Sequence, residues 1–203
     1  MLTQVLPCRS GIAFFCASSV RLSKKGTIMR RTRKWALAGL AATLLFLPTA
    51  PASAEDINGL IATTRIIREN SRLVGNVTCT VTGAPCISFG APRITLLLNG
   101  FTMVGQADPA NACNGTTQVA GEQGISSNNQ SDVEIRGPGV VRGFRADGIL
   151  FAGTLNGKVE GITVTTNCLS GIRVLATSSR ISIAGNIAVR NGAASPGLQC
   201  GGI

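Results

Sequence analysis

A glycine followed by a branched aliphatic residue recurs along the second half of the chain at nearly constant intervals. The four pairs are Gly124-Ile125, Gly148-Ile149, Gly171-Ile172 and Gly197-Leu198, separated by 24, 23 and 26 residues. A repeat of this length, rich in Gly, Val, Ile, Thr and Asn, is too short for a helix pair and fits one turn of a parallel β-helix. The spacing therefore predicts an all-β solenoid, a right-handed parallel β-helix of about five coils of roughly 24 residues.

Short stretches that alternate with the strand period of two lie around these glycines. Each is three to five residues long and ends in Gly, Asn or Ser. They are residues 94–96, 133–135, 162–164, 172–174, 181–183 and 187–189. No window after residue 54 carries a helical stripe. Short strands at this spacing favour a solenoid over a sandwich of long hairpin strands.

The landmarks of each coil recur at three positions. One column contains Val104, Val141, Val164 and Val189; a second contains Ile87, Ile125, Ile149, Ile172 and Leu198, with Phe89, Phe151, Val174 and Cys200 two residues later; a third contains Ile94, Val133, Val159 and Ile181. Because strand side chains alternate and stacked strands lie about 4.8 Å apart, each column is predicted to form a buried ladder. Glycine and asparagine between the strands are expected to supply the corner conformations.

The segment 29–54 has the features of a signal peptide. A basic stretch leads into the apolar run 35–47, and the small residues Ala52 and Ala54 stand at positions −3 and −1 of a cleavage site before Glu55. The apolar run is shorter than the roughly 20 residues that span a bilayer. We therefore expect a secreted or periplasmic protein with no stable membrane insertion after cleavage.

Removing the leader changes the charge of the chain. Of the 19 Lys and Arg residues, eight precede residue 55, whereas all nine Asp and Glu follow it. The formal net charge of +10 therefore falls to about +2, and we expect no nucleic-acid partner. Residues 55–203 are expected to form a single β-helix domain. Residues 1–28 precede a complete signal peptide and are predicted to be an upstream extension, with Met29 as a candidate start.

Three parts of this domain depart from the repeat. Residues 106–123 contain extra Ala, Asn, Gly and Thr and are predicted to form a loop insertion that projects from the coil. The segment 57–83 fits the repeat poorly, as expected for an N-terminal coil and cap. No matching cap follows Gly197. Because a solenoid covers its terminal sheet edges, we expect this uncapped end to be completed by further coils or a partner.

Several phrases of the chain resemble a known family. They are residues 97–102 (LLNGFT), 135–144 (IRGPGVVRGF), 147–149 (DGI) and 164–167 (VTTN). They resemble the secreted right-handed β-helix repeat proteins of the pectin-lyase-like superfamily, including the periplasmic repeat proteins associated with nitrous oxide reductase maturation. The resemblance implies the fold rather than one chemistry, because lyases, hydrolases, epimerases and adhesins share this coil pattern.

The catalytic groups of such enzymes are not found in this chain. Polygalacturonase-like hydrolysis needs clustered aspartates and a histidine, and the chain has no histidine. The acids after the leader are scattered, and no acidic cluster for calcium is readable beside a basic residue. An epimerase-like Asp-Pro-His-Asp is absent, because Asp108-Pro109 continues with Ala110. We predict no cofactor, no metal site and no recognisable catalytic constellation.

Four polar residues are the candidates for substrate binding. Arg142 and Arg190 each follow the core valine of their coil, which predicts one outward column with Thr165 between them. Such a column could bind acidic sugars, and a solvated face is the alternative. Arg145 and Asp147 form the other polar cluster, which is either a corner with a salt bridge or a binding spot.

Two further features bear on carbohydrate binding. Arg136 and Glu160 are expected to be neighbours on adjacent coils, as an ion pair worth well under about 1 kcal/mol when exposed. After the leader the chain has no Trp, no Tyr and four Phe, of which Phe89 and Phe151 are assigned to the core. Because sugar-binding platforms usually use exposed aromatic faces, polar, groove-type recognition is the expected mode.

Five cysteines remain after the leader, and export permits disulfides. Cys79 and Cys86 are the first predicted pair, a local staple near the N-terminal cap. Cys113 and Cys168 are the second, because the projecting loop and a later turn share one angular sector. Cys200 is left over, either as a buried free thiol or because the chain continues. A metal site is disfavoured for want of histidine and of close Cys-x-x-Cys spacing.

The sequence thus predicts a secreted β-helix that binds acidic polysaccharide or serves a surface-structural role, rather than an enzyme. One alternative is a polysaccharide lyase or hydrolase acting on acidic glycans, with Arg142, Arg145, Asp147 or Arg190 as its catalytic groups. The other is a fragment of a longer adhesin-like solenoid.

Overall fold

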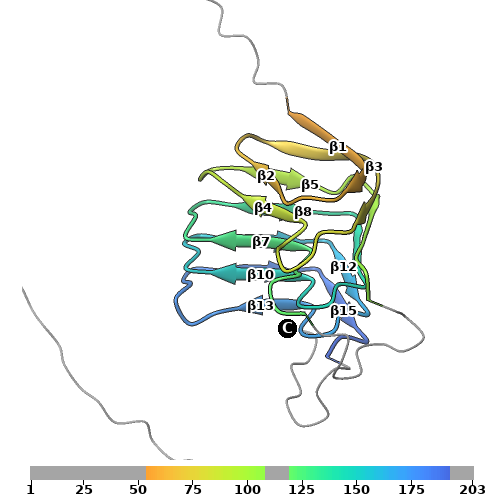
Figure 1. The fold of residues 1–203 in the computed structure, drawn as a ribbon. Helices are drawn as coiled ribbons and strands as arrows, with labels where there is room; N and C mark the ends of the chain where they lie inside the picture. Colours follow the sequence, from red (N-terminus) through yellow and green to blue (C-terminus); the bar gives the residue numbers. More distant parts are fainter. Residues whose placement is uncertain (1–53, 108–118, 193–203) are drawn as a thin grey trace, which may run out of the picture. The chain divides into compact units, whose positions relative to one another are not determined.

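Strands of successive repeats lie side by side and pair in parallel throughout the described part of the protein. A computed structural model describes residues 54–107 and 119–192 (Figure 1). Within these residues every helix or strand element is a β-strand. The strands form two parallel sheets that curl into a half-barrel, which confirms the predicted all-β class and is compatible with a solenoid.

The larger sheet has ten strands, and its long central strand β3 joins two stacks. In sheet order the strands are β14 (Ser182–Ala184), β11 (Lys158–Glu160), β8 (Glu134–Arg136), β5 (Thr95–Leu97), β3 (Ser71–Cys79), β6 (Thr102–Val104), β9 (Val140–Arg142), β12 (Thr163–Thr165) and β15 (Ile187–Val189), while β1 (Glu55–Ile61) pairs with β3. The beginning of β3 pairs with β5, and its end pairs with β6.

The smaller sheet stacks five short strands. In sheet order they are β13 (Ile172–Val174), β10 (Ile149–Ala152), β7 (Ile125–Asn128), β4 (Ile87–Phe89) and β2 (Arg65–Ile67). Figure 1 shows these strands one above another, with the larger sheet curling around beside them. Each step down this stack adds one repeat of the sequence.

The predicted isoleucine ladder is confirmed by the strand register. Ile87, Ile125, Ile149 and Ile172 pair in sequence across the smaller sheet, and each is at most 1% exposed. Burial of a side chain of this size contributes about 1.5–3 kcal/mol. Ser127 stands between Phe89 and Phe151 in the neighbouring inward row. Leu198 and Cys200, which were predicted to continue these columns, lie outside the described residues.

The other two predicted ladders are correct only in part. The valine ladder contains Val141 and Val164 as predicted, but Met103 and Ala188 take the positions predicted for Val104 and Val189. In the third ladder Ile94 and Val133 are buried as predicted, whereas Val159 lies in the neighbouring inward row with Leu96, Ile135 and Ile183. Val104 and Val189 therefore face outward, and Val159 pairs with Ile135 rather than with Val133. Successive strand side chains point to opposite faces, so a run of three apolar residues does not reveal which of them are buried.

The glycines of the Gly-Ile pairs are required by close packing rather than by a left-handed backbone. A Cβ atom on Gly124 would lie 2.6 Å from the carbonyl oxygen of Gly148 and 2.8 Å from a ring atom of Phe144. A Cβ atom on Gly148 would lie 2.8 Å from the carbonyl oxygen of Gly171. No side chain fits between repeats that approach this closely.

One stacked corner takes its left-handed conformation from residues other than glycine. Arg93, Asp132, Asn156 and Arg180 have φ values of 59°, 57°, 56° and 55°, and each stands two residues before strands that pair in register. The backbone N–H of Asn156 donates to the carbonyl oxygen of Ser179 in the next repeat. The corner is therefore fixed by bonds between repeats, which offset the cost of the left-handed conformation.

Asparagine side chains join consecutive repeats at two other turns. The Oδ1 atom of Asn191 accepts from the backbone N–H of Asn167 at 3.1 Å, and its Nδ2 atom donates to the carbonyl oxygen of Val164 at 3.0 Å. Asn186 bonds in the same way to Ile162 and Val159, 24 and 27 residues earlier. These amides satisfy backbone groups where the strands end.

The boundaries proposed for the two ends stay predictions. The upstream extension 1–28 and the signal peptide 29–54, apart from Ala54, lie outside the described residues, as do residues 193–203 and the loop segment 108–118. The two ends of that predicted loop insertion contact a single corner. Ala107 N–H donates to the carbonyl oxygen of Gly143 at 2.7 Å, and Val119 N–H donates to that of Arg145 at 3.0 Å.

Candidate functional site

Arg142 lies at the centre of one outward face of the larger sheet. It is the last residue of β9, is exposed, and pairs in register with Val104 on β6 and Thr165 on β12. The outward residues of β6, β9, β12 and β15 are Thr102, Val104, Val140, Arg142, Thr163, Thr165, Ile187 and Val189. We call this set the threonine-arginine face. Its hydroxyl groups and its guanidinium are the groups that could bind a polar ligand.

Arg190 does not share the column of Arg142. Thr165 pairs with Arg142 on one side and with Val189 on the other, so Arg190 stands one residue beyond the column. It is exposed at the edge of the threonine-arginine face and has φ of 54°. The prediction of a shared column is wrong because Ala188, rather than Val189, points inward. Arg142 ends β9 and Arg190 directly follows β15, and only β12 lies between these two strands.

The threonine-arginine face contains no carboxylate among its outward residues. Arg142 and Arg190 form no ion pair or hydrogen bond with residues 54–107 or 119–192. Ile187 and Val189 are 57% and 45% exposed, and Arg142 is also exposed, whereas the other outward residues of the face are half-buried. An exposed guanidinium without an acidic partner keeps its donors available for a carboxylate brought by a ligand.

The adjacent outward face on β8 and β11 is different, because its charges neutralise one another. Glu134 contacts Arg136 at 2.8 Å and Lys158 at 3.1 Å, and Lys158 contacts Glu160 at 2.5 Å. The hydrogen bond from Arg136 holds the pKa of the Glu134 carboxyl below its ordinary value. Arg136 and Glu160 are register neighbours as predicted, but Arg136 forms its ion pair with Glu134 on its own strand.

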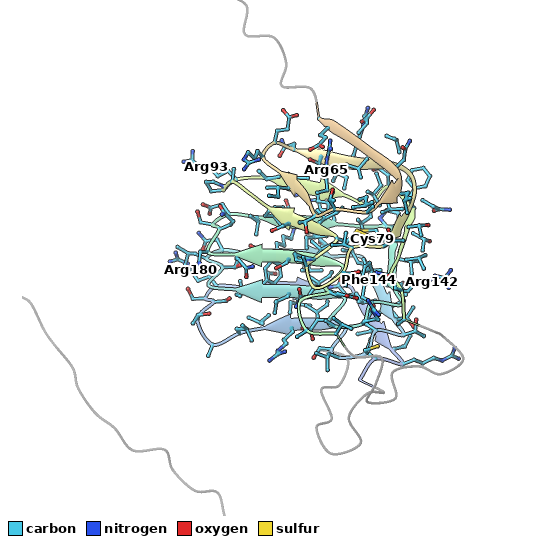
Figure 2. All side chains as sticks on the ribbon, in the orientation of Figure 1. Arg65, Cys79, Arg93, Arg142, Phe144 and Arg180 are labelled. Atoms are coloured by element: carbon cyan, nitrogen blue, oxygen red, sulfur yellow. A yellow bond between two sulfur atoms is a disulfide. The ribbon has the colours of Figure 1, made fainter. Side chains whose placement is uncertain are left out.

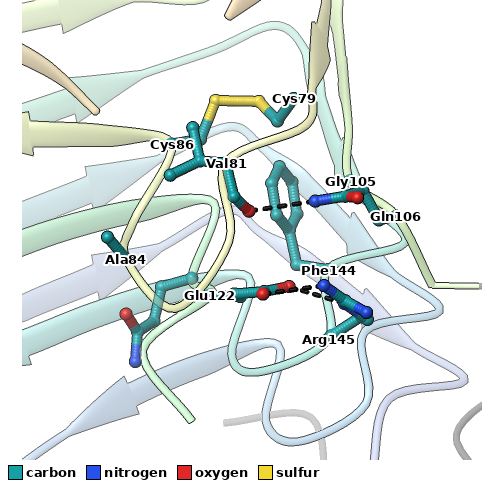
Figure 3. A pocket seen from close by; sticks show the side chains of 10 residues that line it. Cys79, Val81, Ala84, Cys86, Gly105, Gln106, Glu122, Phe144 and Arg145 are labelled. Carbon is teal, nitrogen blue, oxygen red and sulfur yellow. Dashed lines mark hydrogen bonds and ion pairs between the residues drawn. A yellow bond between two sulfur atoms is a disulfide. The ribbon is translucent and has the colours of Figure 1, made fainter. Parts of the chain in front are cut away.

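Arg145 binds Glu122 rather than Asp147, which corrects the predicted salt bridge. Its Nε atom donates to Oε2 at 2.6 Å and its Nη2 atom donates to Oε1 at 2.7 Å (Figure 3). Glu122 is 4% exposed and also accepts the backbone N–H of Gly83 at 2.9 Å. Glu122 was not singled out from the sequence, although its separation of 23 residues from Arg145 equals one repeat.

Asp147 is buried beneath an arginine from the next repeat. It is 1% exposed, and its Oδ1 atom accepts the backbone N–H of Ser170 at 3.0 Å. Its Oδ2 atom lies 3.6 Å from Nη1 of Arg173 and has no hydrogen bond within the described part of the chain. Burial raises the pKa of the Asp147 carboxyl above its ordinary value, while Ser170 and Arg173 oppose this. A carboxyl enclosed in this way is a corner element and not a sugar contact.

The cavity beside Arg145 is too small for a sugar. Figure 3 shows it between the disulfide, Phe144 and the Glu122–Arg145 pair, and its volume is about 10 Å³. That volume is about one water-sized sphere. Gln106 crosses it to donate to the carbonyl oxygen of Val81 at 2.9 Å. The arrangement ties the loop after β3 to the corner after β9.

The first predicted disulfide is present. Cys79 and Cys86 are bonded, with Cα atoms 5.9 Å apart, and both are buried. Cys168 is also buried and disulfide-bonded. Cys113, the partner predicted for it, lies outside the described residues, so that pairing stays a prediction.

Two further arginines lie on the opposite side of the protein. Arg93 and Arg180 occupy the left-handed corner column, away from Arg142 (Figure 2). Neither forms an ion pair within residues 54–107 and 119–192. Because exposed arginines stand on both sides, an unpaired charge alone does not define a site. The threonine-arginine face is distinguished by the outward threonines Thr163 and Thr165 on the strand next to Arg142.

No group of three or more His, Cys, Asp or Glu in the described ranges is placed to hold a metal ion. The same ranges contain no helix with the length and apolar character needed to cross a membrane. Comparison of the chain with protein-family models, with curated proteins and with solved structures finds no match. The functional inference is therefore based on the residues of the chain and their geometry.

Proposed function

We propose that this chain is an exported right-handed parallel β-helix of about five coils of roughly 24 residues, similar to proteins of the pectin-lyase-like superfamily. The register supports this, because three inward rows repeat at steps of 23 or 24 residues between β7 and β15. The leader before Glu55 supports export to the periplasm or the exterior.

Its proposed role is to bind acidic polysaccharide on the threonine-arginine face, without catalysis. The observation that carries this proposal is Arg142, an exposed guanidinium with no acidic partner in the described residues, flanked on the next strand by Thr163 and Thr165. Arginine binds a carboxylate through two parallel hydrogen bonds. Threonine hydroxyls donate to and accept from sugar hydroxyls.

The expected affinity is modest and depends on salt. Exposed charge pairs contribute up to about 1 kcal/mol each, and screening weakens them at high ionic strength. A polymer that crosses several strands adds many such contacts, so a long ligand should bind more tightly than a short one. This dependence on length and salt separates face binding from binding in a closed pocket.

The test compares two double variants that remove the same charge from opposite sides. Arg142→Ala with Arg190→Asn alters the proposed face, and Arg93→Asn with Arg180→Asn is the matched control. Asparagine tolerates the left-handed backbone that Arg190, Arg93 and Arg180 adopt. Binding of polygalacturonate is measured by calorimetry at low and physiological salt, with a neutral galactan as the ligand control.

We expect the first double variant to bind polygalacturonate about tenfold more weakly, because the two lost contacts together approach 1.4 kcal/mol. The control variant should bind like the wild type. Equal losses in both variants would show that binding depends on net charge and not on this face. Incubation with pectate or alginate tests for catalysis. A rise in absorbance from unsaturated products would show that the protein is a lyase and would overturn the proposal of binding without catalysis.

A further inference from the structure

The first strand begins at the residue that the predicted leader cleavage would leave as the N-terminus. The cleavage site before Glu55 rests on Ala52 and Ala54 in the sequence, and β1 starts at Glu55 in the structure. No spacer separates the bond to be cut from the paired strand. The predicted cut and the start of β1 thus fall at the same position.

Several bonds hold Glu55 in the folded protein. Its backbone N–H donates to the carbonyl oxygen of Asn70 at 2.9 Å. Its carboxylate is paired with Arg65 and accepts a hydrogen bond from Ser71 Oγ at 3.4 Å. The Glu55 side chain is 16% exposed. The residue on the carboxyl side of the cut is therefore fixed by backbone and side-chain contacts.

The residues after Glu55 are fixed as well. Asp56 pairs in register with Arg72, and the Arg72 Nε atom donates to its Oδ1 at 2.6 Å. Ile57 pairs with Leu73 and is 4% exposed in the hydrophobic core. To free these three residues, β1 must leave β3 and Ile57 must leave the core, which is a local unfolding step with a free-energy cost.

A protease needs the residues on both sides of its target bond in an extended, unpaired conformation, and it cuts a folded segment only through locally opened states. We propose that the Ala54–Glu55 bond is cut before β1 pairs with β3, and that folding then shields the bond. This inference rests on the export proposed above. It means that the chain reaches the signal peptidase unfolded, and that a precursor which folds first stays uncut.

The product of the cut fits the fold without rearrangement. Water adds to the carbonyl carbon of Ala54, the bond to the Glu55 nitrogen breaks, Ala54 becomes a carboxylate and the nitrogen becomes an α-ammonium group. That ammonium occupies the place of the Glu55 N–H and keeps the hydrogen bond to Asn70. The mature chain can therefore form the same β1–β3 pairing that the uncut precursor forms.

The experiment uses the folded full-length precursor and purified signal peptidase in detergent micelles. A spacer variant carries three Gly-Ser pairs between Ala54 and Glu55, which moves the cut away from β1 and leaves the leader unchanged. An Arg65→Ala variant is intermediate, because it removes the partner of the Glu55 carboxylate. An unstructured peptide of residues 29–70 reports whether the peptidase recognises the leader. Mass spectrometry measures the rate and the position of the cut.

We expect the folded precursor to be cut at least about tenfold more slowly than the spacer variant, with the Arg65→Ala variant in between. Equal rates for the folded precursor and the spacer variant would overturn the shielding, while a cut at Ala54–Glu55 in the peptide would leave the export proposal standing. If neither the peptide nor the spacer variant is cut after Ala54, the leader assignment fails, and the export proposal and this inference fail with it.

Discussion

Arg145 binds Glu122 through two hydrogen bonds of 2.6 and 2.7 Å across one repeat of 23 residues. The carboxylate is 4% exposed, whereas the arginine side chain is 24% exposed. This pair joins the end of the loop insertion to the corner after β9, and the Gly83 N–H adds the loop after β3. Three segments that are distant in the sequence therefore depend on one buried carboxylate.

Glu122→Ala should lower the free energy of unfolding by about 3–5 kcal/mol, because it removes one partner of a largely buried charge pair. Urea denaturation followed by circular dichroism measures the loss. Asp56→Ala is the matched control, since Asp56 pairs with Arg72 while its side chain is 51% exposed, and its effect should be clearly smaller. Similar losses in the two variants would contradict a special role for Glu122.

Asp147→Asn should become progressively more stabilising relative to the wild type as the pH rises from about 4 toward neutrality. Burial raises the pKa of the Asp147 carboxyl above its ordinary value of 3.8, so the folded state holds the proton more tightly than the unfolded state. The cost of ionising the buried group is absent below the unfolded pKa, grows until the folded pKa is passed, and is constant above it. Denaturation curves at several pH values test this. A difference that does not change with pH would refute it.

Gly124→Ala should destabilise the protein by about 1–3 kcal/mol through overpacking. The added methyl group would lie 2.6 Å from the backbone oxygen of Gly148, which cannot move without shifting a strand. Gly100→Asn is the control, because Gly100 has φ of +83° with no atom near its missing Cβ, and asparagine accepts that backbone. Thermal unfolding of both variants distinguishes crowding from backbone conformation; equal shifts in Tm would argue against crowding at Gly124.

The double variant Cys79→Ser with Cys86→Ser should lose about 2 kcal/mol of stability, as expected for a disulfide that closes a loop of seven residues. The variant is preferable to a reducing agent, because Cys168 is also disulfide-bonded. Urea denaturation under oxidising conditions measures the change. A midpoint and slope identical to the wild type would show that Glu122 and Gln106 hold this loop without the disulfide.

The candidate site was only partly predictable from the sequence. Arg142 was correctly placed on an outward face, because it follows a valine that the repeat marks as buried. Arg190 was placed in the same column by treating Val189 as the inward residue, but Ala188 is the residue in the inward row. Arg145 and Asp147 are two residues apart, which suggested a local pair, yet each binds a residue of a neighbouring repeat. Proximity in a stacked fold follows the repeat length more than the local spacing.

The sequence by itself determined the parallel stacking of short strands and the isoleucine ladder, because the regular interval between Gly-Ile pairs can be read directly along the chain. It also determined the Cys79–Cys86 bond, because these two cysteines are only seven residues apart. Only the tertiary structure decided which apolar residues face inward on β6 and β15, why glycine is needed at residues 124 and 148, and which partners the buried acids take. These depend on the register between repeats, where a shift of one residue reverses every side chain, and on contacts about one repeat away in the sequence.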